Sequence, residues 1–110
     1  MTAITLTDKE TAIREKLIKA ASEGNKLYYS DLIEEGDASL VRSLGAILEK
    51  ITRFDIENKQ PILASIVVAK STGLPNEGFF EMCDTLDIDA YLSDMQKECF
   101  EWWKERHNKI

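Results

Sequence analysis

The sequence predicts a mixed α+β domain that is mostly helical, with a small two- or three-stranded sheet and a long C-terminal helix. Apolar residues recur at helical spacing through several stretches, and two shorter segments are rich in residues that favour strands. A chain of 110 residues without a repeat or a linker-like stretch suits one domain, residues 1–110, with a single modest core.

The first helix is expected to begin directly after Thr7. The stretch "TDKE" fits a capping box, in which the Thr7 hydroxyl reaches the amide of Glu10 and the Glu10 carboxylate returns to the amide of Thr7. Ile13 and Leu17 then recur at helical spacing, and Gly24-Asn25 is expected to end the helix.

The next segments predict a strand over 26–29 and a short helix over 31–35, which Ser30 would cap and Gly36 would end. The longest middle helix is expected over 38–58, capped by Asp37 or Ser39. Its apolar stripe consists of Leu40, Leu44, Ile47, Leu48, Ile51 and Phe54.

Gly45 interrupts this middle helix. A glycine inside a helix costs about 1 kcal/mol relative to alanine, so we expect a neighbouring backbone to approach it closely.

The stretch "PILASIVVAK" predicts a strand that is buried on both faces. Pro61 suits the first position of a strand, and 62–69 is apolar on both alternations apart from one serine. Its expected partner is the strand over 26–29, because a lone strand would leave its backbone groups unpaired. A turn with a positive φ at Gly73 follows. Asn76 should then cap a helix whose inward residues are Phe79 and either Met82 or Cys83.

The last helix is expected over 88–109, with Asp87 and Asp89 as caps. Its apolar residues fill an arc of roughly 180° at helical spacing. Either Ile4 and Leu6 cover part of this arc, or part of it faces another chain. The residues of the arc are Ile88, Tyr91, Leu92, Met95, Cys99, Phe100, Trp102, Trp103 and His107.

Residues 26–73 carry short motifs that resemble a known DNA-binding domain. The motifs are "YYSDL" with Tyr29, "VRSLGAI" with Arg42 and Gly45, and "PILASIVV" with Pro61. In this order they resemble the winged-helix domain, with its helix-turn-helix, of O6-alkylguanine-DNA alkyltransferases and alkyltransferase-like proteins. The resemblance implies a winged-helix-like fold.

The same resemblance implies that alkyl transfer is absent. Ile62 stands in the place of the family's nucleophilic cysteine, and Leu63 stands in the place of its activating histidine. The stretch 61–80 is also similar to a pattern in small uncharacterised prokaryotic proteins, and that likeness implies no function.

The charge balance disfavours a nucleic-acid partner. The chain has 20 acidic and 14 basic residues, a net charge of −6, and the segment 76–101 holds many acids and the single base Lys97. Such a segment repels a phosphate backbone. The start "MTAITLTDKE" does not read as a secretion signal, and no apolar run is long enough for a membrane span. We therefore expect a cytoplasmic protein with reduced cysteines and no membrane partner.

Catalytic patterns are weak, so we expect no enzyme, no metal and no cofactor. Cys83 and Cys99 have no histidine nearby in sequence, and the single histidine, His107, is close to the C-terminus. Two cysteines and one histidine at these spacings match no usual zinc pattern. A hydrolase-type enzyme stays as a third alternative.

The sequence predicts a non-catalytic binding module that contacts a protein partner, with self-association left open. The expected contact residues are the aromatics Phe79, Phe80, Tyr91, Phe100, Trp102 and Trp103. The alternative is a winged-helix DNA-binding regulator. Its contact residues would be Tyr29, Arg42, Lys50 and Arg53.

Overall fold

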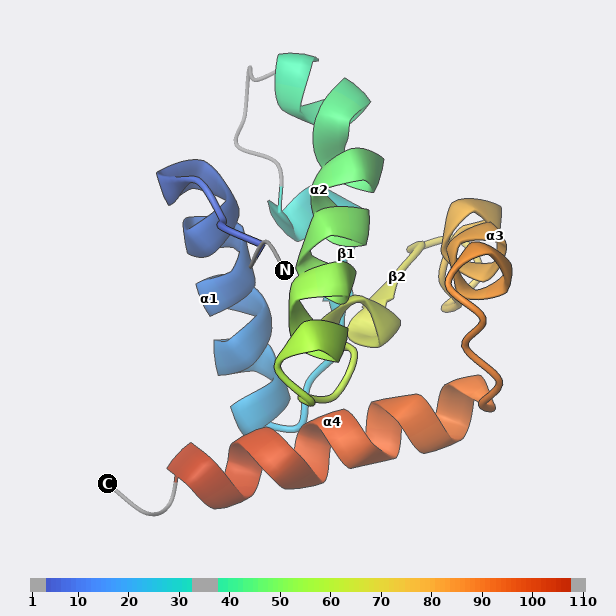
Figure 1. Cartoon of the computed structure of the whole chain (residues 1–110). Coiled ribbons are helices and arrows are strands. Elements are labelled where there is room, and N and C mark those ends of the chain that lie inside the picture. Colours follow the sequence, from blue (N-terminus) through green and yellow to red (C-terminus); the bar gives the residue numbers. More distant parts are fainter. Residues whose placement is uncertain (1–3, 33–37, 108–110) are drawn as a thin grey trace.

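The computed structural model describes residues 4–32 and 38–107, which form a mixed α+β fold. Helices α1 and α2 lie side by side, α4 crosses below both, and α3 lies beyond η2 and β2 (Figure 1). In chain order the elements are α1 (Asp8–Ser22), β1 (Leu27–Tyr28), the 3-10 helix η1 (Tyr29–Leu32), α2 (Ala38–Glu57), the 3-10 helix η2 (Leu63–Ile66), β2 (Val67–Val68), α3 (Glu77–Thr85) and α4 (Leu92–His107).

The capping box of α1 is confirmed. The Thr7 amide donates to Glu10 Oε1 at 2.7 Å, and the Glu10 amide donates to Thr7 Oγ1 at 3.2 Å. The helix ends as expected, since Gly24 has a φ of +74° and the Asn25 amide returns to the carbonyl of Ala20 at 2.8 Å. These two ends fix α1 in a position that buries its apolar face against the core.

The stripe of α2 is confirmed at Leu44, Ile47, Leu48 and Ile51, which are all buried. Phe54 is only half-buried. The expected Leu40 side chain lies outside the described residues, as do Gly36 and the cap Asp37. Ser39 lies within α2, so it does not cap this helix.

The short helix predicted over 31–35 is wrong in type and bounds. Where the structure describes this segment, it forms a 3-10 turn over Tyr29–Leu32, which begins before the predicted cap at Ser30, and residues 33–35 lie outside the described residues. The Tyr28 amide donates to Asp31 Oδ2 at 2.9 Å. An aspartate that bonds a nearby amide favours a local turn over a regular helix.

The strand predicted over 62–69 is also wrong for its first half, which forms η2. Ser65 explains the turn, because both its amide (3.1 Å) and its hydroxyl (2.7 Å) donate to the carbonyl of Ile62. The amide of Leu63 is satisfied by Asp55 Oδ2 at 3.3 Å. All side chains of η2 are buried, among α1, α2 and α4. Burial on every side produces the continuous apolar run, and such a run does not by itself select a strand.

The predicted pairing of the two strand segments is confirmed, although both strands are short. They form a parallel two-stranded sheet in which Leu27 pairs with Val67 and Tyr28 pairs with Val68. Val67 and Val68 are buried. The pairing joins the end of η2 to the segment that precedes η1.

The turn before α3 follows the prediction at Gly73, whose φ is +72°. Asn76 takes the N-cap position, but its side chain makes no capping hydrogen bond. Helix α3 buries Phe79, Met82 and Cys83.

The last helix begins at Leu92 rather than at residue 88, so the predicted capping roles of Asp87 and Asp89 are wrong. Asp87 has a φ of +57° and ends α3 instead. The Ile88 amide donates to the carbonyl of Cys83 at 2.8 Å, which is the bond that closes a helix through a left-handed residue.

Most of the apolar arc of α4 is used within the domain. Met95 and Cys99 are buried, and Phe100 and Trp103 pack partly against the core. Gln96 Nε2 donates to the carbonyl of Ser65 at 2.9 Å, which ties α4 to η2. Helix α4 therefore closes the core against α1 and η2. Across 4–32 and 38–107, no helix combines the length and the apolar character that crossing a bilayer requires.

Candidate binding groove

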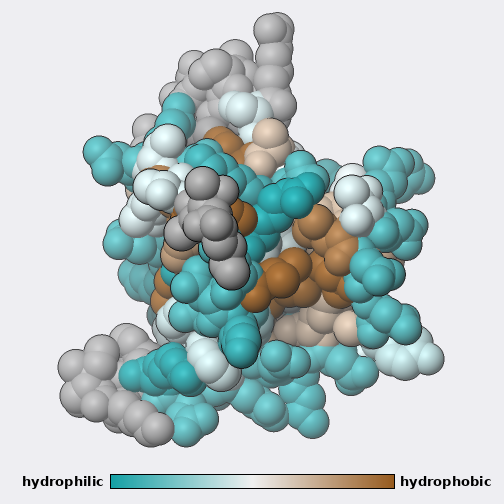
Figure 2. Space-filling view, in the orientation of Figure 1, coloured by the Kyte–Doolittle hydropathy of each residue, from teal (hydrophilic) through white to brown (hydrophobic). Residues whose placement is uncertain are grey.

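A groove of about 510 Å³ lies between α2 and α3, with η2 at its base. Figure 2 shows hydrophobic residues gathered between these two helices, with hydrophilic residues around them. The volume is in the range of pockets that hold small ligands or anchoring side chains. The apolar residues of the lining are Leu44, Leu48, Ala64, Phe79 and Met82.

Two glycines on facing walls keep the groove open. Gly45 of α2 and Gly78 of α3 both line it, and a Cβ atom built on either would meet no heavy atom within 4 Å. The expected close approach of a backbone to Gly45 is therefore wrong. The missing side chain of Gly45 adds space to the groove instead.

Tyr29 adds a polar group to this apolar lining. Its hydroxyl oxygen accepts from the Asn76 amide at 2.9 Å, which orients the ring beside the start of α3. Burial raises the pKa of Tyr29, so the hydroxyl keeps its proton at neutral pH. Because Tyr29 lines the groove, this protonated hydroxyl can donate to an occupant.

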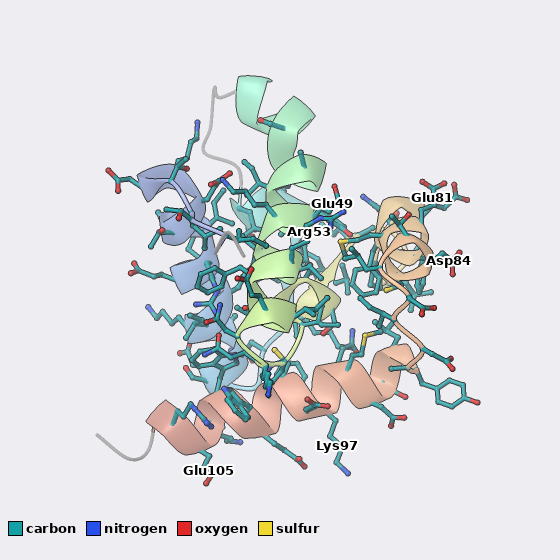
Figure 3. The ribbon with its side chains drawn as sticks, viewed as in Figure 1. Glu49, Arg53, Glu81, Asp84, Lys97 and Glu105 are labelled. Carbon is teal, nitrogen blue, oxygen red and sulfur yellow. The ribbon has the colours of Figure 1, made fainter. Side chains whose placement is uncertain are left out.

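Carboxylates dominate the rim. Glu49 of α2 and Glu81 of α3 both line the groove. Glu49 is paired with Arg53 Nη2 at 3.3 Å, and both of these side chains are partly exposed. Figure 3 shows that Glu49 and Arg53 project from the side of α2 that faces α3, whereas Glu81 and Asp84 project from the outer side of α3.

Helix α3 carries a row of acids with no base. Glu77, Glu81 and Asp84 are all exposed, and their i, i+4, i+7 spacing puts them on one side of the helix. We call this row the acidic edge. Glu81 of this row lines the groove, so the acidic edge begins at the rim and continues over the outer side of α3 (Figure 3).

The predicted aromatic contact residues do not form one exposed surface. Phe79 is buried and packs edge to face on Phe80, which is exposed. Tyr91 is 80% exposed and lies before the start of α4. Phe100, Trp102 and Trp103 are half-buried. Of the six residues, only Phe80 and Tyr91 are freely accessible.

An arginine packs over the ring of each of the two tryptophans near the end of α4. Arg14 lies over the ring of Trp103, with its Cζ atom 5.6 Å from the ring centroid, and Arg106 lies over Trp102 at 3.3 Å. Cation–π contacts of this kind stabilise the helix end within the domain. They reduce the aromatic area that a partner could bind.

Two of the basic side chains that were predicted to contact DNA form ion pairs within the domain instead. Lys50 Nζ pairs with Glu10 Oε1 at 2.9 Å, and Arg53 pairs with Glu49. Tyr29 lines the groove described above. The Arg42 side chain lies outside the described residues. Lys50 and Arg53 therefore do not form a free basic face.

A buried ion pair was missed in the sequence. Asp55 is 0% exposed, and its Oδ1 accepts from Arg14 Nη2 at 2.7 Å and from Arg14 Nε at 3.2 Å. Arg14 Nη2 also donates to Gln60 Oε1 at 2.6 Å. The available indication was the position of Asp55, four residues after Ile51 on the buried side of α2.

The cysteines have the environment of inert core residues. Cys83 and Cys99 are buried. Burial raises the pKa of Cys83, and nearby Asp84 raises it further. Burial, followed by the charges of Asp55 and Glu98, raises the pKa of Cys99 to about 12. Neither thiol is activated as a nucleophile.

The side chain of His107 lies outside the described residues. Within 4–32 and 38–107, no group of three or more histidine, cysteine or acidic side chains is arranged to hold a metal ion.

Comparison of the chain with protein-family models, with curated proteins and with solved structures found no match. What the chain does is therefore inferred from its own residues and geometry.

Proposed function

We propose that the chain is a non-catalytic binding module that acts through contact with a protein partner, and that the groove between α2 and α3 is its contact surface. The observation that carries this proposal is an apolar floor that two glycines leave uncovered. Anchoring side chains of a partner bind best in such desolvated hollows, with polar groups around them.

The polar groups support binding rather than chemistry. Tyr29 and Asn76 are engaged with each other, and Glu49 is engaged with Arg53. A nucleophile needs an adjacent base and an orienting group. The groove lining contains no cysteine, histidine or serine to act as one.

The DNA-binding alternative has less support. It would treat the domain as a winged helix that contacts DNA through Tyr29, Arg42, Lys50 and Arg53. A DNA-binding face releases counterions through free lysines and arginines. Lys50 and Arg53 instead each pair with a carboxylate, Lys50 with Glu10 of α1 and Arg53 with Glu49 of α2.

Site-specific photocrosslinking in the cells that make the chain tests the proposal. We expect the photoreactive amino acid p-benzoylphenylalanine in place of Thr85, which is exposed in the groove lining, to give a discrete protein adduct. The same amino acid in place of Ala12, which is exposed on α1, should not give that adduct.

A second change makes the result specific to the groove. Gly45→Leu should remove the Thr85 adduct, because the new side chain occupies the space in which a partner would sit. If both crosslinking positions give the same adducts, or if the chain instead binds duplex DNA saturably and in a salt-sensitive way, the proposal is wrong.

A further inference from the structure

We propose that the occupant of the groove is a basic amphipathic segment of a partner protein, with large apolar side chains on the groove floor and lysines or arginines against the acidic edge. This inference rests on the proposed function and adds the chemistry of the partner. It follows from the charge that surrounds the apolar floor and from the exclusion of a second copy of the chain.

The acidic edge sets the charge of the occupant. The first and last acids of this row, Glu77 and Asp84, are seven positions apart, which is about 10 Å along a helix. No base lies in α3, and Arg53, on the side of α2 that faces α3 (Figure 3), is paired with Glu49. A segment that covers the groove and α3 is therefore attracted if it is basic and repelled if it is acidic.

The floor sets the apolar part of the occupant. Leu44, Leu48 and Met82 are buried residues whose surfaces line an open hollow. The hollow holds about 510 Å³, so it accepts more than one large side chain. Next to it, the hydroxyl proton of Tyr29 can be donated to a backbone carbonyl of the bound segment.

A second copy of this chain fits poorly. The most exposed aromatic residue is Tyr91, at 80%, and it lies between Asp89 and Asp94. An insertion of Tyr91 into the groove would bring these acids to the acidic edge. The whole chain carries a net charge of −6, which adds to the repulsion. Charge complementarity thus favours a different, basic partner.

The test uses two synthetic amphipathic peptides with identical helical spacing, one built of leucine and lysine and the other of leucine and glutamate. Binding is followed by calorimetry and by the amide signals of glycines in a ¹H–¹⁵N NMR spectrum. We expect the leucine–lysine peptide to bind about tenfold or more tightly than the leucine–glutamate peptide. The amides of Gly45 and Gly78 should shift, and the amide of Gly24, in the turn after α1, should not.

Matched variants locate the binding. Gly45→Leu should weaken the leucine–lysine peptide about tenfold or more, whereas Ala46→Leu should leave its affinity unchanged. Ala46 is the next residue on α2, is exposed and does not line the groove. Neither change alters the charge, so non-specific attraction to an acidic protein would affect both variants equally.

The outcomes separate this inference from the proposed function. Equal binding of both peptides in the groove, with shifts at Gly45 and Gly78, would overturn the basic partner and leave the groove as a contact surface. Binding that leaves these two amides unshifted, or that Gly45→Leu does not weaken, would overturn both. Self-association of the unliganded chain that Gly45→Leu abolishes would show that the occupant is a second copy and would overturn this inference alone.

Discussion

Asp55 is an acidic residue with no exposure to water, although its charged form is stabilised by hydration. It is fully buried in α2, and burial raises its pKa from 3.8 to about 6 even though Arg14 and the Leu63 amide bond to the charged form. Its second oxygen accepts from the first amide of η2. One carboxylate thus holds α1, α2 and η2 together, and its protonation is linked to stability.

The shift predicts a pH dependence of unfolding. Because the folded pKa lies above the unfolded one, the folded chain binds more protons between pH 4 and pH 6, so the free energy of unfolding rises as pH falls through this window. From this group alone we expect a rise of about 1 kcal/mol from pH 7 to pH 5. The pKa of Glu10 is lowered, mainly by the Thr7 amide and by Lys50. This group makes the free energy of unfolding decrease as pH falls, but mainly below pH 4.5, outside the measured window. Urea unfolding at the two pH values measures the difference.

A pair of variants assigns this pH dependence to Asp55. In Asp55→Asn the rise should disappear, because the titrating group is gone. In Asp84→Asn, which changes an exposed carboxylate, it should remain. If Asp55→Asn keeps the full rise, the raised pKa does not belong to Asp55.

The two thiols predict a second measurement at this scale. In single-cysteine variants, Cys83→Ala and Cys99→Ala, the remaining thiol should react with an aromatic disulfide reagent much more slowly in the folded chain than in denaturant. Cys83 is 8% exposed and Cys99 is 0% exposed, so Cys99 should be the slower of the two. A Cys99 that reacts in the folded chain as fast as a free thiol would contradict the closed core beneath α4.

Helix α2 contains a glycine that the fold does not require. Gly45 has no positive φ, and a Cβ atom would meet nothing. Gly45→Ala should therefore raise the free energy of unfolding by about 1 kcal/mol, since alanine is the better helix former. The reverse change one residue later, Ala46→Gly, should lower it by a similar amount. Chemical denaturation of both variants measures the change in the free energy of unfolding. A loss of stability in Gly45→Ala would mean that other atoms of the chain occupy the space beside Gly45 in solution.

The elements that the sequence predicted well are those with local causes. The capping box at Thr7, the end of α1 at Gly24 and the turn at Gly73 each depend on neighbours in the chain, and each is confirmed. The first half of the 62–69 segment was predicted wrongly. Its 3-10 turn depends on Asp55, which is remote in sequence, as well as on Ser65, and the apolar pattern contains no trace of that contact.

The candidate site was less predictable than the fold. Phe79 was correctly predicted on the inward face of α3. The sequence did not indicate that Trp103 would pack within the domain or that Leu44 and Met82 would line a hollow. That distinction depends on how α3 and α4 are placed, and the placement depends on Asp87, which turns the chain between them with a φ of +57°. The winged-helix resemblance stays a prediction.

At the scale of the whole molecule, the groove lies over one side of the core, because Leu44, Leu48, Phe79 and Met82 belong both to the core and to the groove lining. Helices α1 and α4 cover another side of the core and bury Leu17, Met95 and Cys99 (Figure 1). The groove stays open between α2 and α3. The open side carries the acidic edge. We propose that apolar contact in the groove and opposite charge at the acidic edge together select the partner.

Charge reversal tests this claim most directly. Glu77→Lys, Glu81→Lys and Asp84→Lys, made together, should reverse the preference, so that the leucine–glutamate peptide binds more tightly than the leucine–lysine peptide. The control is Asp94→Lys, Glu98→Lys and Glu101→Lys, which reverses three exposed acids at the same spacing on α4 and changes the net charge equally. The control chain should still prefer the leucine–lysine peptide. If both triple variants change their preference alike, overall charge and not the acidic edge selects the peptide, and the claim is wrong.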